Sequence, residues 1–261
     1  MAAQTPLVLE DASLTEFVRY ILDHHEGPSI LVVGGTKEDF LAAFRGNAER
    51  QVSSNEPQVT RSESPSVTHD HFATHRAASS QDAWTAPTLR MLAASHTVKV
   101  VFCPDITHLR AYLATHAGQP YGKHLKTIPH SKRVLALLNI VALHRPTSAF
   151  SAQGLNRTIS AAVEAACVSN SRLVIAECDD HASKHQRDLD TSVDTIEPAV
   201  RDAAQQLTRS VWDEEVSILN VTTKSFGAGE RGWVGRTVRV RDVAGRWCHF
   251  ERLPRDLSAG Q

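Results

Sequence analysis

The sequence predicts an α/β fold, with a mixed, mostly parallel sheet, antiparallel C-terminal strands and helices on both faces. Three observations predict it. Residues 134–143 are almost wholly apolar, which is typical of a strand buried on both faces. Residues 155–166 repeat apolar side chains at three- and four-residue steps, and a second apolar run follows at 173–176. Strand, helix and strand of this length form a right-handed crossover between parallel strands.

The residues before this crossover alternate between helical and strand patterns. The first helix is expected to begin at Asp11 or Ser13 and to end at Asp23, because Ser13 and Glu16 have the spacing of a capping box. The other elements expected here are a strand at 29–33, a helix at 37–44, a helix at 86–94, a strand at 98–103 and a helix from Pro104–Asp105.

We expect a single domain over residues 1–261, with a flexible insertion at 46–82 and a disordered tail at 252–261. The insertion is rich in Ser, Thr, Asn, Gln, Pro and His and has no apolar periodicity. A polar loop at 179–194 and a helix at 196–212 are expected next. The last third then predicts an antiparallel meander at the end of the parallel sheet, with strands within 215–226, 233–243 and 247–253.

The composition excludes some classes of protein. Lys and Arg number 28 against 29 for Asp and Glu, so no overall basic field indicates nucleic-acid binding, although a local patch is compatible with it. The four cysteines are scattered without a C-x-x-C pair, and we expect them to be reduced core residues rather than disulfide partners or metal ligands. No signal peptide is recognisable, and no apolar run approaches the roughly 20 residues that span a bilayer. We therefore expect a protein of the nucleus or cytoplasm with no membrane partner.

The turn after the 29–33 strand is placed where nucleotide-binding folds hold a phosphate. A phosphate loop requires G-x-x-x-x-G-K-[ST], whereas this turn reads GGTKED, and its Lys37 is followed by two carboxylates. The apolar strand at 134–143 also lacks the acidic residue that orders magnesium in ATPases, and its Asn139 is expected to form hydrogen bonds at a strand end. We therefore predict no nucleotide cofactor and no catalytic residue.

Two groups of residues offer a metal-site alternative. His69, His71 and His75 lie in the expected insertion, and Glu177 with Asp179 and Asp180 follows the 173–176 strand. A metal-dependent hydrolase or transferase built on the acidic group is the rival hypothesis. Because these residues lie at a strand end leading into a polar loop, they are more simply interpreted as solvated charges, and no metal is assigned. The hydroxyls of the 145–154 turn are expected to cap the helix that follows.

Basic residues form three groups that we assign as candidate nucleic-acid contacts: the end of the 123–133 loop, the arginines flanking the Ser-rich turn, and the C-terminal strands. The candidates are Lys132, Arg133, Arg145, Arg157, Lys224, Arg236, Arg239 and Arg241. Phe226, Trp233 and Trp247 lie among the C-terminal ones and offer stacking surfaces for bases. The alternative is an ordinary solvated β face with aromatic cover.

The order of elements over residues 29–251 resembles the RecA-like recombinase core and its degenerate paralogues. The resemblance lies in RVLALLNIVALH at the Walker B position, the Ser-rich turn after it, the helix GLNRTISAAVEAACVSN, the strand SRLVIAEC and the ending RTVRVRDVAGRWCHFE. Two groups share this fold without a working Walker A motif. Subunits of the Shu-complex type imply a pseudo-ATPase that binds DNA beside a paralogue in homologous recombination. Elongator accessory subunits imply an assembly that binds tRNA. The basic C-terminal strands favour the first.

Overall fold

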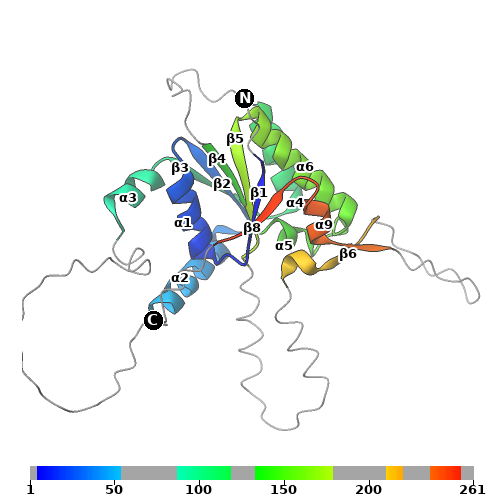
Figure 1. Ribbon diagram of the computed structural model, residues 1–261, viewed down its shortest axis with the longest axis horizontal. Coiled ribbons are helices and arrows are strands. Elements are labelled where there is room, and N and C mark those ends of the chain that lie inside the picture. Colours follow the sequence, from blue (N-terminus) through cyan, green and yellow to red (C-terminus); the bar gives the residue numbers. More distant parts are fainter. Residues whose placement is uncertain (1–4, 54–86, 119–132, 179–209, 220–235, 254–261) are drawn as a thin grey trace, which may run out of the picture.

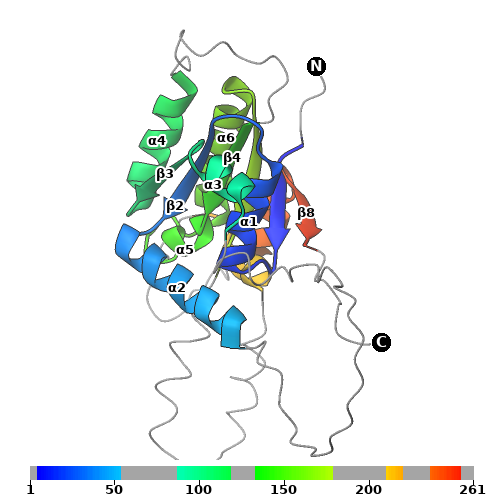
Figure 2. The ribbon, with the colours of Figure 1, turned by 90° about the vertical axis from the view of Figure 1, so that its left-hand side faces the viewer.

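The computed structural model describes residues 5–53, 87–118, 133–178, 210–219 and 236–253. At its centre is a six-stranded sheet with the order β3-β2-β4-β5-β1-β8, in which every neighbouring pair is parallel. Helices cover both faces of this sheet (Figures 1 and 2). The predicted α/β class, with a mostly parallel sheet between two helical layers, is confirmed.

The strands of this sheet are β1 (Leu7–Glu10), β2 (Ser29–Gly34), β3 (Val98–Cys103), β4 (Arg133–Leu138), β5 (Ser171–Ala176) and β8 (His249–Arg252). The register places Leu135 of β4 between Ile30 of β2 and Leu173 of β5, and all three belong to one core cluster. The next residue of β4, Ala136, belongs to the cluster on the opposite face. Successive side chains of a strand point to opposite faces, so a strand covered on both sides is apolar throughout.

Each face of the sheet has its own helices. One face packs against α4 (Ile106–Gly118), α5 (Ile140–His144), α6 (Ala152–Val168), α9 (Val240–Ala244) and the short 3-10 helix η1 (Val211–Asp213). The other packs against α1 (Leu14–His24) and α2 (Lys37–Ser53), with α3 (Leu89–Ser95) beside α1. The connection from β1 to β2 therefore runs over one face, and the connection from β4 to β5 runs over the other.

The start of α1 confirms the predicted capping box. The backbone N–H of Glu16 donates to Ser13 Oγ at 3.3 Å, and the backbone N–H of Ser13 donates to Glu16 Oε2 at 2.8 Å. These two bonds satisfy amides that would otherwise lack acceptors at the helix start. Phe17 and Ile21 then lie one turn apart on the buried face and anchor the helix to the sheet.

The apolar run at 134–143 is not one strand. β4 ends at Leu138, Asn139 has a left-handed backbone with φ of 59°, and α5 starts at Ile140. Asn139 donates its N–H to the Ala176 carbonyl at 3.0 Å and accepts the Cys178 N–H on Oδ1 at 2.8 Å. The prediction that Asn139 forms hydrogen bonds at a strand end is thus confirmed, while the expected length of the strand was wrong. Asn tolerates the left-handed region better than the apolar residues around it.

The C-terminal third differs from the predicted meander. The antiparallel pair exists as β6 (Glu215–Ser217) with β7 (Thr237–Arg239), but it is a separate sheet. The chain then turns into α9, and β8 joins the main sheet parallel to β1. Strand β1 was not foreseen. The predicted attachment of an antiparallel meander to the parallel sheet is therefore wrong.

The expected boundaries also change at two places. α2 continues to Ser53, so residues 46–53 of the expected insertion are helical, and residues 54–82 lie outside the described part. Arg252 still belongs to β8, which shortens the expected tail. Of the helix expected at 196–212, only residues 210–212 are described, and the 3-10 helix η1 begins there and continues to Asp213. Within the described ranges, the helices are all too short or too polar to cross a membrane.

Candidate functional site

A crevice is expected where two neighbouring parallel strands send the following chain to opposite faces of a sheet. β1 and β5 are such neighbours, because β1 leads into α1 on one face and the chain after β5 next appears as η1 on the other. Ligands of α/β proteins bind at such positions, outside the carboxyl ends of the strands. The topology therefore directs attention to the residues directly after β1 and β5.

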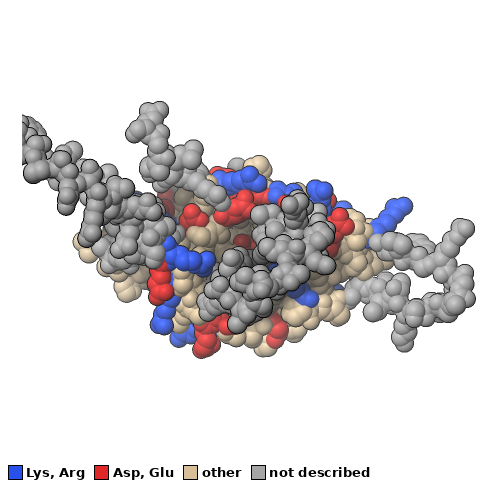
Figure 3. All heavy atoms as spheres, turned by 90° about the horizontal axis from the view of Figure 1, so that it is seen from below, with Lys and Arg blue, Asp and Glu red and all other residues tan. Residues whose placement is uncertain are grey.

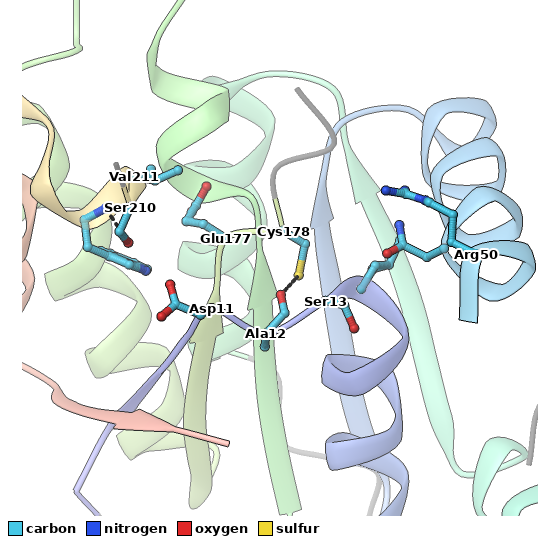
Figure 4. Close-up of a pocket in the computed structure, with 11 residues that line it drawn as sticks. Asp11, Ala12, Ser13, Arg50, Glu177, Cys178, Ser210 and Val211 are labelled. Carbon is cyan, nitrogen blue, oxygen red and sulfur yellow. Dashed lines mark hydrogen bonds between the residues drawn. The ribbon is translucent and has the colours of Figure 1, made fainter. Parts of the chain in front are cut away.

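A pocket of about 300 Å³ lies at this position (Figure 4). It is lined by the residues that follow β1 and β5, by two side chains of α2 and by the start of η1. These residues are Asp11, Ala12, Ser13, Leu14, Asn47, Arg50, Glu177, Cys178, Ser210, Val211 and Trp212. Acidic side chains come from the strand ends, and a guanidinium comes from α2. From the sequence, Asp11 is expected only as a candidate cap of the first helix, and Arg50 and Trp212 are assigned no site role.

The pocket is at the position of a phosphate site, but its chemistry does not suit a phosphate. The turn from β1 into α1 reads Glu-Asp-Ala-Ser, and Asp11 has a left-handed backbone with φ of 53°. Two of the amides at the start of α1, those of Ser13 and Glu16, are engaged by the capping box of the same helix. Carboxylates beside a helix N-terminus interact favourably with its dipole and repel a phosphate. The Glu16 carboxylate therefore accepts a hydrogen bond at the helix start that a bound phosphate would otherwise accept.

Glu177 at the end of β5 has a structural role. Its Oε1 accepts the backbone N–H of Val141 at 2.7 Å, and its Oε2 accepts that of Ala142 at 3.2 Å. The side chain is buried and serves as the N-terminal cap of α5, which lacks a side-chain cap from its own Asn139. Of the rival metal ligands, Asp179 and Asp180 lie outside the described residues. Among the residues described, no three His, Cys, Asp or Glu side chains gather as metal ligands would.

The η1 wall of the pocket is attached to β1 through Arg241. This guanidinium forms an ion pair with the buried carboxylate of Glu10, lies 3.4 Å from Asp213 Oδ1 and is stacked 4.8 Å from the centre of the Phe250 ring. Burial acts to lower the pKa of Arg241, but the hydrogen bonds and charges of Glu10 and Asp213 outweigh it and raise that pKa. Trp212 packs edge-on against the same Phe250 ring at 5.4 Å. Arg241, assigned from the sequence to nucleic acid, is thus engaged inside the fold.

The turn after β2, which the sequence placed at the phosphate position, is filled by packing. A side chain at Gly34 would put its Cβ 2.6 Å from the Asn139 carbonyl oxygen, so only glycine fits. Gly35 has a φ of 135°, and its N–H donates to the Cys103 carbonyl at 2.8 Å. Thr36 Oγ1 accepts the backbone N–H of Asp39 at 3.2 Å and so caps α2. Gly34 is thus explained by a close backbone contact and Gly35 by its positive φ, without a phosphate.

The turn between α5 and α6 contains a buried polar chain that begins at Arg110. Its Nε donates to Thr158 Oγ1 at 3.0 Å, and Thr158 Oγ1 lies 3.0 Å from His144 Nε2. His144 Nδ1 lies 3.2 Å from the Ala149 carbonyl oxygen, which can only accept, so Nδ1 carries the hydrogen. Nε2 therefore accepts a hydrogen bond from the Thr158 hydroxyl. Burial is the main cause that lowers the pKa of His144 to about 4, and the Arg110 charge also lowers it. The hydrogen bond to Ala149 acts in the opposite direction and raises this pKa. Ser151 caps α6 by accepting the Gly154 N–H at 3.2 Å, as the sequence predicted for these hydroxyls.

The other basic candidates do not form one group. Arg133 starts β4, at the opposite end of the sheet from the pocket, and Arg145 forms an ion pair with Glu214 at 3.0 Å. Arg157 on α6 is exposed, as are Arg236 and Arg239 at β7, and Lys132 and Lys224 lie outside the described residues. Figure 3, which looks at the carboxyl ends of the strands, shows acidic and basic side chains intermixed. A continuous basic surface is not visible in this view.

The four cysteines are free thiols. Cys103 and Cys248 are buried, and burial raises the pKa of Cys248 to about 12, so this thiol is inert at neutral pH. Cys178, at the pocket, lies 3.2 Å from the Ala12 carbonyl and links the ends of β5 and β1. Cys167 is exposed on α6. The prediction of core cysteines is confirmed for Cys103 and Cys248, whereas it is wrong for Cys167, which is exposed.

A comparison with protein families adds one finding. The model of a family described as SPAC22G7.03-like matches residues 65–214, which is more than half of the chain. The chain belongs to the SPAC22G7.03-like family. The family match includes the crossover from β4 to β5 with Arg110, Glu177 and Trp212, whereas Asp11 and Arg241 lie outside it. No curated protein and no solved structure matches the chain.

Proposed function

We propose that the chain is a non-catalytic RecA-like subunit, a pseudo-ATPase, of a nucleic-acid-binding assembly, with another RecA-like paralogue as its partner. The proposal rests on the pocket at the carboxyl ends of β1 and β5, which we call the carboxyl-edge pocket. The amides of Ser13 and Glu16 at the start of α1 are engaged by the capping box, and Asp11 and Glu177 line the pocket beside them. A nucleoside triphosphate carries about four negative charges, so it would meet two carboxylates there while two of the helix-start amides are already engaged.

As the first candidate, we propose a subunit of a DNA-repair assembly for homologous recombination, in the nucleus or cytoplasm. Support comes from Arg157, Arg236 and Arg239, which are exposed and form no ion pair with the described residues. Guanidinium groups of this kind are suited to the phosphates of a nucleic-acid backbone.

An Elongator-type accessory subunit acting in tRNA wobble-uridine modification is the second candidate. The ion pair between Arg241 and Glu10 favours this candidate relative to the first one. Arg241 belongs to the basic C-terminal set on which the preference for DNA depends. With that residue committed to the fold, the remaining arginines do not separate DNA from tRNA.

The rival enzyme hypothesis, a metal-dependent hydrolase or transferase, relies on Glu177 as a ligand. Both of its carboxylate oxygens accept backbone amides of α5. A metal would have to compete with these bonds and leave the helix start without its cap. We therefore favour the binding module.

The proposal is tested by purifying the tagged full chain from its native cells and identifying the proteins that accompany it in stoichiometric amounts. Recombination paralogues support the first assembly, and Elongator subunits support the second. A chain that purifies alone and hydrolyses a substrate in a metal-dependent manner contradicts the proposal. Glu177→Gln serves as the internal control, because it removes a candidate metal ligand while retaining an oxygen that accepts an α5 amide.

A further inference from the structure

Two arginines, Arg110 and Arg157, lie beside the start of α6. Arg110 of α4 donates from Nε to Thr158 and from Nη2 to the Gly154 carbonyl at 2.9 Å, and both acceptors are neutral. Arg157 is exposed one turn away, and its charge acts, after burial, to lower the pKa of Arg110. Within the described residues, neither guanidinium forms an ion pair. The two positive groups repel each other, and an external anion that contacts both relieves this repulsion.

The surrounding elements supply little negative charge. Within the bounds of α4, α5 and α6 the single carboxylate is Glu164, which is exposed two turns along α6 from Arg157. The neighbouring α9 adds Asp242. At the start of α6, a polyanion approaching this face would therefore contact guanidinium groups rather than carboxylates.

An aromatic side chain is held on the other side of the same helix. Trp247 follows α9, is 37% exposed, and donates from Nε1 to Asn156 Oδ1 at 2.9 Å. Asn156 directly precedes Arg157 in α6, and α9 packs against α6 (Figure 1). The hydrogen bond fixes the orientation of an indole that remains open to solvent. A fixed and partly exposed aromatic ring is a platform on which an unpaired base stacks.

We infer that Arg110, Arg157 and Trp247 form a binding surface for single-stranded nucleic acid across the start of α6. The guanidinium groups contact backbone phosphates, and the indole stacks on a base. This inference deepens the proposed function and rests on its nucleic-acid component. It adds Arg110, which was not among the sequence candidates, and it selects Arg157 and Trp247 from them. An acidic protein segment would use the arginines but would gain nothing specific from the indole.

The test measures binding of labelled oligothymidine, the matching RNA and a DNA duplex to the full chain by fluorescence anisotropy, between about 50 and 200 mM salt. Arg157→Gln is expected to lower the slope of log K against log salt by about 0.7 on single strands, as for one lost phosphate contact. Arg90→Gln is the matched control, because Arg90 is exposed on α3 beside the opposite face. Its slope is expected to equal that of the wild type.

The stacking contact is tested separately. Trp247→Ala is expected to weaken binding about five- to a hundredfold, while Trp247→Phe retains most of it because a ring remains. Equal affinity of the Ala variant and the wild type, equal losses in the Ala and Phe variants, or tighter binding of the duplex overturns the inference. Competition by polyglutamate that matches the oligonucleotides identifies an acidic-protein surface and also overturns it. DNA and RNA are distinguished by their relative affinities.

Failure of the inference and failure of the proposed function give different results. If the wild type binds oligonucleotides and the Arg157 and Trp247 variants bind equally well, the inference fails and the proposed function stands. If the wild type binds none of the three ligands, the nucleic-acid component of the proposed function fails as well. Matched unfolding midpoints of all variants show that the comparison is made between folded proteins.

Discussion

Replacing Arg241 by alanine is expected to destabilise the fold, because this residue compensates a buried carboxylate. Glu10 is 8% exposed in its side chain, and Arg241 contributes an ion pair to it, a second one to Asp213 and a cation–π contact to Phe250. Removing one partner of a buried pair costs about 3–5 kcal/mol. Arg241 is itself 31% exposed and Arg252 still lies 3.4 Å from Glu10, which reduces the cost. We expect a loss of about 2–3 kcal/mol in the free energy of unfolding.

The assay is thermal unfolding of the full chain followed by circular dichroism. About 2–3 kcal/mol corresponds to a fall of about 4–12 °C in the melting temperature of a chain of this size. Arg239→Ala is the control, because Arg239 is exposed on β7 and its loss should leave the melting temperature within about 2 °C. Adding Glu10→Gln to Arg241→Ala should recover part of the loss, since the buried charge is gone. An Arg241→Ala melting temperature equal to that of the wild type would show that Arg241 does not compensate the buried charge of Glu10.

Two further predictions concern the α5–α6 turn. Because the pKa of His144 is lowered to about 4, the folded chain binds a proton at this residue more weakly than the unfolded chain does. The stability that neutral His144 contributes is therefore present above pH 6.5 and is lost as the pH falls towards 4. The total loss is about 3 kcal/mol. Urea midpoints of the wild type and His144→Gln should therefore converge on acidification, and a constant difference contradicts the assignment. Gly154→Ala should cost about 1–3 kcal/mol, because its Cβ would lie 2.0 Å from the Ala149 carbonyl oxygen, whereas Gly46→Ala in α2 meets no atom within 4 Å and should be neutral or stabilising. Equal urea midpoints of the two alanine variants would show that the close contact is not real.

The parts of the fold that the sequence predicted depend on local patterns. The capping box at Ser13 and Glu16, the strands β2 and β3 and the helix α6 all have their signals within a few consecutive residues. β1 has only three apolar residues before Glu10, and its strand partners β5 and β8 are far away in the sequence. No local pattern distinguishes such a strand from an ordinary N-terminal segment.

The misread C-terminal region shows the same limit. Val240, Val243 and Ala244 are buried at helical spacing, yet the valines also alternate with arginines as in a half-buried strand. Over so few residues the two periods are not separable. The pocket was missed because it follows β1. The role of Arg241 was missed because its partner Glu10 is near the other end of the chain, and only the parallel pairing of β1 and β8 brings the two regions together.

We propose that the pocket after β1 and β5 does not bind a nucleoside triphosphate, and a calorimetric titration of the full chain with ATP in the presence of magnesium tests this. We expect no saturable heat, because the amides of Ser13 and Glu16 are engaged by the capping box of α1 while Asp11 and Glu177 line the pocket. Saturable, magnesium-dependent binding in the micromolar range, weakened by substitution of Asp11 or Arg50, would contradict it.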